Sequence, residues 1–153
     1  DTIIGANHKG AIVSLVDRKS KYTFLYALPN KTAALVTNAI VACLKKMPAK
    51  MKKTITYDNG KEFSSHEKIA KALKVKCYFA TPYCSWERGL NEHTNGLVRE
   101  YFPKGTNLSI ITNKQVKFVE KQLNDRPRKV LGYLTPREVI AGIKKPKSIA
   151  LRC

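Results

Sequence analysis

Hydrophobic residues gather in three short runs at the start of the chain, over residues 1–5, 11–16 and 22–28. The runs are rich in β-branched and aromatic side chains, and short turn-forming segments with Asn, Asp, Gly and Ser separate them. Connectors this short join antiparallel neighbours, because a parallel pair needs a crossover of a dozen or more residues. The pattern therefore predicts a three-stranded antiparallel meander.

After this meander, the pattern changes to helices that alternate with strands. The predicted elements are a helix capped by Asn30 and reaching Met47, a strand over 54–57, a helix opened by the capping box at 64–67 and reaching Leu73, and a strand over 75–80. Right-handed crossovers should place these two strands parallel to the first one. We therefore expect an α/β fold with a five-stranded mixed sheet and helices on both faces.

The remainder of the chain is predicted to be helical, over residues 86–101, from a cap at Thr112 to before Pro127, and from Thr135 onward. Thr135 begins the last helix with Pro136 at the first helical position and Glu138 three residues after the cap. No internal repeat or linker divides the sequence. We expect a single domain over residues 1–153.

The charge of the chain points to a polyanionic partner. There are 29 Lys and Arg residues against 11 Asp and Glu, a formal net charge of +18. No apolar run approaches the roughly 20 residues that span a bilayer, so nucleic acid is favoured over a membrane. The four cysteines form no C-x-x-C motif, and no signal-peptide pattern is present. We expect reduced thiols and a cytoplasmic location.

Asp58 is the first candidate for chemistry, because it follows an apolar strand and begins an Asp-Asn-Gly turn. Ligands bind at the carboxyl ends of parallel strands in open α/β sheets. The alternative interpretation is that these residues simply suit a turn.

Glu92 is the second candidate, on the predicted helix over 86–101. The apolar stripe of this helix contains Trp86, Leu90, Leu97 and Tyr101. Glu92 lies off this stripe, so it is either a solvated partner of Arg88 or part of a functional face. Gly89 and Gly96 flank it, and each costs about 1 kcal/mol inside a helix. Close approach by a large ligand would explain both glycines.

Two longer motifs carry a resemblance to a known family. Residues 57–63 (Tyr-Asp-Asn-Gly-Lys-Glu-Phe) and residues 82–99 resemble the signatures of bacterial transposases of the insertion sequence 30 type. Residues 101–106, 123–128 and 134–136 are similar to that family as well, and 33 residues separate Asp58 from Glu92, the spacing expected there. These transposases belong with retroviral integrases to a superfamily whose active site is Asp, Asp, Glu.

The resemblance implies a ribonuclease H-like fold with a catalytic, metal-binding triad of Asp1, Asp58 and Glu92. Asp17 is the competitor for the first position. Hard divalent cations bind oxygen ligands, and two of them about 4 Å apart can serve both sides of an in-line displacement at phosphorus. Mg²⁺ is the expected metal and Mn²⁺ its expected substitute.

The implied function is DNA transposition, in which water cuts the ends of the element and the freed 3′ hydroxyl attacks target DNA. Phosphate contacts are expected from Lys61, Arg88, Arg99 and Lys104, with self-association in a transposition complex on the nucleoid. The chain is expected to be a fragment without the upstream DNA-recognition region. The alternatives are a ribonuclease H-type nuclease and a non-catalytic DNA-binding remnant.

Overall fold

The first three strands form an antiparallel sheet in the computed structural model, which describes residues 1–45, 47–82, 84, 87 and 89–143. The sheet has the order β1 (Thr2–Ile4), β2 (Ala11–Val16), β3 (Thr23–Leu28). Thr2 pairs with Val13, and Ile12 pairs with Ala27. The predicted meander is confirmed.

The other two strands, β4 (Thr54–Tyr57) and β5 (Lys76–Phe79), form a parallel pair joined by α2 (His66–Leu73). The predicted parallel direction of these two strands relative to each other is confirmed, but the prediction of one five-stranded sheet needs correction. The described strands form a three-stranded sheet and a two-stranded sheet, with no backbone ladder from β1 to β4. The reason is visible at β1, which is only three residues long and is linked to the segment after β4 by a side-chain hydrogen bond from Thr2 to Glu62.

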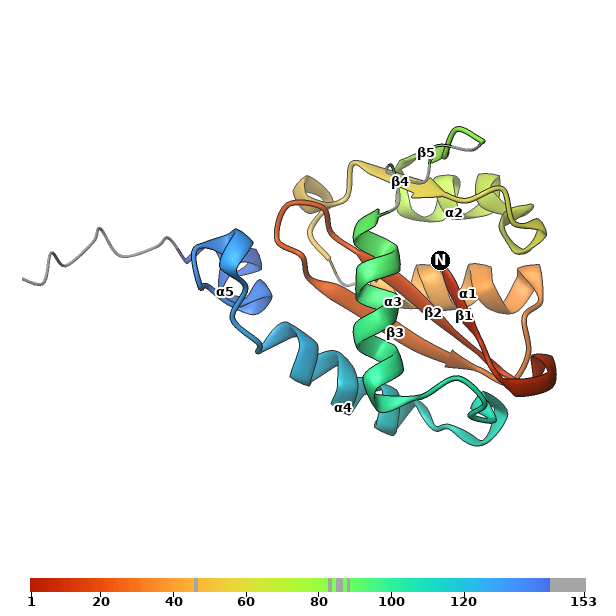
Figure 1. Cartoon of the computed structure of the whole chain (residues 1–153). Helices are drawn as coiled ribbons and strands as arrows, with labels where there is room; N and C mark the ends of the chain where they lie inside the picture. Colours follow the sequence, from red (N-terminus) through yellow and green to blue (C-terminus); the bar gives the residue numbers. More distant parts are fainter. Residues whose placement is uncertain (46, 83, 85–86, 88, 144–153) are drawn as a thin grey trace, which may run out of the picture.

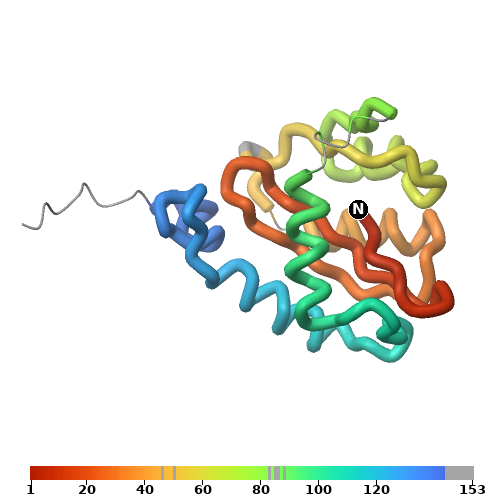
Figure 2. The backbone as a smooth tube through the Cα atoms, viewed as in Figure 1, coloured from red at the N-terminus to blue at the C-terminus, as the bar shows by residue number. Residues whose placement is uncertain are grey.

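Helices cover both faces of the antiparallel sheet, as predicted (Figure 1). On one face lies α1 (Ala33–Leu44), with α2 packed against it. On the other face lie α3 (Gly89–Tyr101) and α4 (Asn113–Asn124), and the short α5 (Pro136–Ile140) follows. Figure 2 shows the chain starting near the middle of the fold, between α3 and the segment that carries β4.

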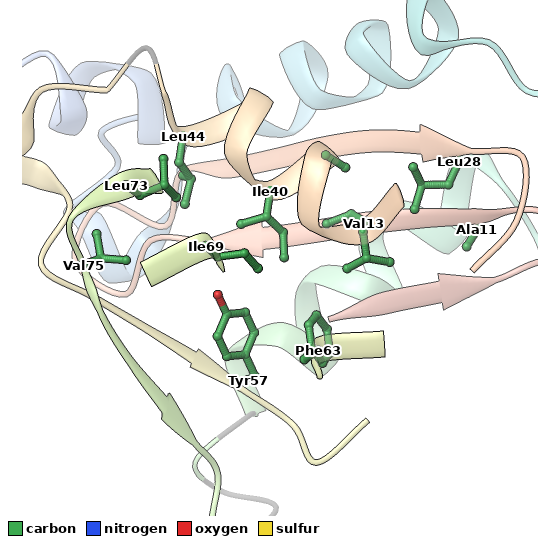
Figure 3. Close-up of a cluster of buried hydrophobic side chains, with 12 residues drawn as sticks. Ala11, Val13, Leu28, Ile40, Leu44, Tyr57, Phe63, Ile69, Leu73 and Val75 are labelled. Carbon is green, nitrogen blue, oxygen red and sulfur yellow. The ribbon is translucent and has the colours of Figure 1, made fainter. Parts of the chain in front are cut away.

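Two buried clusters follow from the alternation of side chains along each strand. Ala11 and Val13 point to the α1 side, whereas Ile12 between them points to the α3 and α4 side. In Figure 3, Tyr57 and Phe63 face the first cluster, where their rings stack with centroids 4.9 Å apart. Phe63 thereby anchors the 3-10 turn Lys61–Phe63 that follows β4.

Most helix boundaries agree with the sequence, and the differences have local causes. The capping boxes Thr112–Gln115 and Thr135–Glu138 are both formed. The first helix is capped by Thr32, with extended backbone, and not by Asn30. The predicted box at 64–67 does not form, because the preceding turn already holds Ser64 in helical conformation.

The apolar stripe predicted for α3 is only partly buried. Tyr101 is 42% exposed and is not part of the core stripe, where α3 buries Thr94, Leu97 and Val98. The predicted stripe member Trp86 lies outside the described residues.

Within the described residues Cys43, Cys77 and Cys84 are free thiols. No helix among these residues is long and apolar enough to cross a membrane.

Candidate active site

Asp1 is held in place by both its backbone and its side chain. Its amino group donates to the Ser14 carbonyl at 3.0 Å, and its carbonyl accepts from the Ser14 amide at 3.0 Å. Its Oδ1 accepts from the Thr2 amide at 2.7 Å, and its Oδ2 accepts from Asn95 Nδ2 at 2.6 Å. Both carboxylate oxygens are therefore oriented by the protein.

Asn95 connects Asp1 to the sheet and to α3. The buried Ser14 hydroxyl donates to Asn95 Oδ1 at 2.7 Å, which fixes the amide so that its NH₂ group faces Asp1. The sequence analysis assigned no role to Asn95. The available signal was its position three residues after Glu92, one helical turn away.

Asp58 follows β4 directly, as predicted, and is half-buried. Its Oδ1 accepts from the Gly60 amide at 3.1 Å, so the residue does shape the turn. A Cβ added to Gly60 would lie 2.9 Å from this oxygen and closer still to Glu62 Oε2. The carboxyl groups of Asp58 and Glu62 thus flank the same glycine.

Glu62 is a buried carboxylate that the sequence interpretation missed. It is 7% exposed, and its Oε1 accepts from Thr2 Oγ1 at 2.8 Å and pairs with Lys31 Nζ at 3.0 Å. Burial alone would raise the pKa of Glu62, but its own backbone amide, Lys31 and Thr2 together outweigh burial and lower this pKa. Glu62 is therefore ionised at neutral pH.

Glu92 lies in the first turn of α3 and is exposed. No hydrogen bond or ion pair joins it to another described residue, and its suggested partner Arg88 lies outside that set. Added Cβ atoms at Gly89 and Gly96 would meet nothing within 4 Å. The face of α3 around Glu92 is therefore open toward solvent.

Within the part of the chain that the structure describes, no three side chains among His, Cys, Asp and Glu lie close enough to hold one metal ion. Asp1, Asp58 and Glu92 are thus not gathered into a three-carboxylate cluster here, and their role as ligands stays a prediction. Asp1 and Asn91 line the same cavity of about 180 Å³, which places the start of α3 beside Asp1.

Asp17, the competitor of Asp1, has a turn role. It follows β2, and its Oδ2 accepts from both the amide and the hydroxyl of Ser20 at 2.6 Å. It also lines the cavity beside Asp1. Its carboxylate is oriented toward its own turn, whereas that of Asp1 is oriented by α3.

The predicted phosphate contacts differ in their surroundings. Lys61 and Lys104 are exposed, and Arg88 lies outside the described residues. Arg99 donates through Nη2 to the Ile4 carbonyl at 2.7 Å, and through Nη1 to the carbonyls of Phe102 and Pro103 at 3.4 Å. The structure gives Arg99 a role in joining α3 to the end of β1.

The sequence is similar to transposases of bacterial insertion sequences. The transposase for insertion sequence element IS4351 of Bacteroides fragilis is 52% identical over 150 residues, which cover 98% of this chain and 46% of the relative. Transposase InsI for insertion sequence element IS30A of Escherichia coli (strain K12) is 40% identical over 138 residues, which cover 90% of this chain and 36% of the relative. The chain spans less than half the length of these curated relatives.

The fold is similar to solved integrase structures. The catalytic core domain of BIV integrase has a TM-score of 0.68 at 21% identity, with 93% of this chain and 91% of that chain covered. A chain of the simian T-cell lymphotropic virus intasome has a TM-score of 0.73 at 16% identity, with 96% of this chain and 54% of that chain covered. The expected ribonuclease H-like fold is confirmed.

The expected resemblance to transposases of the insertion sequence 30 type is also confirmed by these relatives. The family model described as "Integrase core domain" matches residues 1–85, which include Asp1 and Asp58. With more than half of its length matched, the chain belongs to the integrase core domain family.

Proposed function

We propose that this chain is the catalytic core of a DNA transposase, a polynucleotidyl transferase that cuts phosphodiester bonds and joins a 3′ hydroxyl to target DNA. The observation that carries the proposal is the orientation of Asp1 by Asn95 and Thr2, in a family member with a net charge of +18. An excess of cations suits a DNA substrate, whose phosphates attract Lys and Arg regardless of sequence.

Asp1, Asp58 and Glu92 are the proposed metal ligands. Their chemistry fits a hard divalent cation, because carboxylate oxygens are the ligands that Mg²⁺ and Mn²⁺ take. Divalent cations held there would supply positive charge that stabilises the attacking and leaving oxygens of an in-line displacement. The open face of α3 around Glu92 leaves room for DNA to reach the site.

The protein residues would contribute binding and orientation. Asn95 and the Thr2 amide hold the Asp1 carboxylate in one rotamer, which lowers the cost of organising the site during the reaction. Lys61, next to the Asp58 turn, and Lys104, after α3, would bind phosphates, with Arg88 as a further contact. Arg99 would reach phosphate with those donors that its carbonyl partners leave available.

The proposed partners are the ends of the element, target DNA and further copies of the chain in a transposition complex. The proposed place of action is the nucleoid. Self-association follows from the proposed reaction, because two element ends have to be held together while they are joined to the target.

The experiment is a strand-cleavage and strand-transfer assay in Mg²⁺ with three Asp→Asn variants of the whole protein. Asp1→Asn and Asp58→Asn should each abolish both reactions, because each removes a charged ligand at little change of shape. Asp17→Asn is the matched control and should keep activity within a few-fold of the parent. Activity retained by Asp58→Asn would refute the proposal, and cleavage of the RNA strand of a hybrid without strand transfer would favour a ribonuclease H-type nuclease.

A further inference from the structure

The buried carboxylate of Glu62 links the start of β1, next to Asp1, to the turn that follows β4 and Asp58. It is on the turn after β4, and its partner Thr2 directly follows Asp1 on β1. Among the described strands, no ladder of backbone hydrogen bonds joins β1 to β4. The 2.8 Å hydrogen bond from Thr2 Oγ1 to Glu62 Oε1 spans this interval with side chains.

The backbone on either side of this hydrogen bond is fixed. Phe63 is 1% exposed and stacks on Tyr57, so the residue after Glu62 is anchored in the core. Thr2 pairs with Val13 in the antiparallel sheet. The Thr2–Glu62 hydrogen bond therefore connects two elements whose backbones are each fixed by the fold.

Lys31 explains why a third carboxylate is tolerated here. Glu62 Oε2 lies beside Gly60 together with Asp58 Oδ1, and two like charges in a poorly solvated place repel each other. The Lys31 ammonium, 3.0 Å from Glu62 Oε1, offsets this repulsion. With Oε1 bound by Thr2 and Lys31 and the side chain buried, Glu62 is oriented away from a DNA-contacting role.

We infer that Glu62 is a positioning residue for the proposed reaction, which holds Asp1 in register with Asp58 through the Thr2 hydroxyl and depends on Lys31 for charge balance. The inference rests on the proposed function. In this role Glu62 contacts neither DNA nor the reacting phosphate, and it is not one of the proposed metal ligands.

The test is a double-mutant cycle in the strand-transfer assay, with kcat and KM for DNA measured separately. Glu62→Ala and Thr2→Val should each lower kcat roughly 10- to 100-fold, the effect of a small misplacement of catalytic groups. KM for DNA should stay within about 2-fold of the parent, because neither residue binds phosphate. The double variant should be no worse than the worse single variant, because both remove the same link.

Conservative variants separate positioning from general damage. Thr2→Ser keeps the hydroxyl and should keep kcat within about 2-fold, and Glu62→Gln should lie between the parent and Glu62→Ala because it can still accept from Thr2. Thr37→Val is the matched control: this buried hydroxyl has no hydrogen-bond partner among the described residues, so its loss should leave kcat unchanged. If Glu62→Ala does not fold, the Thr2→Val and Thr2→Ser pair decides.

Two results would overturn the inference. One is a parent-like kcat in folded Glu62→Ala or in Thr2→Val, and the other is a double variant whose loss equals the product of the two single losses. Asp58→Asn serves as the reference in the same assay. If Asp58→Asn is inactive while Glu62→Ala is parent-like, only the positioning role fails; if Asp58→Asn is active, the proposed function itself fails.

Discussion

The two halves of the candidate site are built differently. At the start of β1, Asp1 accepts hydrogen bonds on both carboxylate oxygens and pairs with Ser14 through its backbone. At the start of α3, Glu92 is exposed and has no hydrogen bond or ion pair with any other described residue. One carboxylate is oriented by the folded protein, and the other is presented on an open helical face.

This difference indicates that folding alone orients the Asp1 carboxylate but does not orient that of Glu92. The β1 half is attached to the core through the sheet and through Asn95, so its geometry is set on folding. The α3 half is attached by its opposite face, where Thr94, Leu97 and Val98 are buried. We expect metal and DNA to complete the orientation of Glu92, whereas Asp1 needs no such help.

The largest effect is expected for Glu92→Gln, which alters the exposed carboxylate. It should lower cleavage and strand transfer by roughly 10³-fold or more, because a charged ligand is worth several kcal/mol in the transition state. DNA affinity and the thermal unfolding midpoint should hardly change, since Glu92 is exposed. Activity assays, binding assays and thermal melts check the three parts. A parent-like rate would remove Glu92 from the site.

Asn95→Asp tests whether Asp1 depends on its orientation by α3. The new carboxylate would face Asp1 Oδ2, where the amide now donates at 2.6 Å, and like charges about 4 Å apart repel by roughly 4 kcal/mol at an effective dielectric near 20. We expect kcat to fall about 10- to 100-fold, with a smaller change in KM. The control Asn107→Asp makes the same charge change in a loop where Asn107 Oδ1 accepts from Ser109. Equal activity of the two variants would contradict the role of Asn95.

The smallest effects are expected at the surface lysines around both halves. Lys61→Ala and Lys104→Ala should each weaken duplex binding only about 2- to 5-fold, and should reduce the slope of log affinity against log salt by about 0.9. Neither should change sequence preference, because phosphate contacts do not specify bases. Titrations at several salt concentrations measure this, with Lys129→Ala on the distant turn Lys129–Leu131 as the control. A loss as large in the control would show that the positive charge acts without a localised binding face.

The sequence predicted the local structure well where the deciding interactions lie within a few residues. The Thr112 and Thr135 capping boxes need only residues three apart, and both are formed. The same pattern at 64–67 failed because the preceding turn, anchored by Phe63, keeps Ser64 helical, a consequence of packing that no local pattern contains. Tyr101 was placed on the buried stripe by periodicity, yet it is 42% exposed near the end of α3.

The candidate site divides in the same way. Asp1, Asp58 and Glu92 were predicted as site residues from motifs and from their places at a strand, a strand end and a helix, and this role stays a prediction. Their surroundings were not predicted, because Asn95 lies 94 residues from Asp1 and Glu62 lies 60 residues from Thr2. Nothing in a linear pattern tells which distant polar groups will meet.

The sequence by itself thus determined the antiparallel meander, the parallel crossover, the excess of positive charge and the family. Each depends on composition, on short connectors or on periodicity, which are properties of neighbouring residues. Only the tertiary structure decided that β1 and β4 are linked through Thr2 and Glu62, and that Arg99 binds backbone carbonyls. These contacts depend on how sheet, turn and helix pack, because a hydrogen bond of about 3 Å tolerates little error in the placement of either partner.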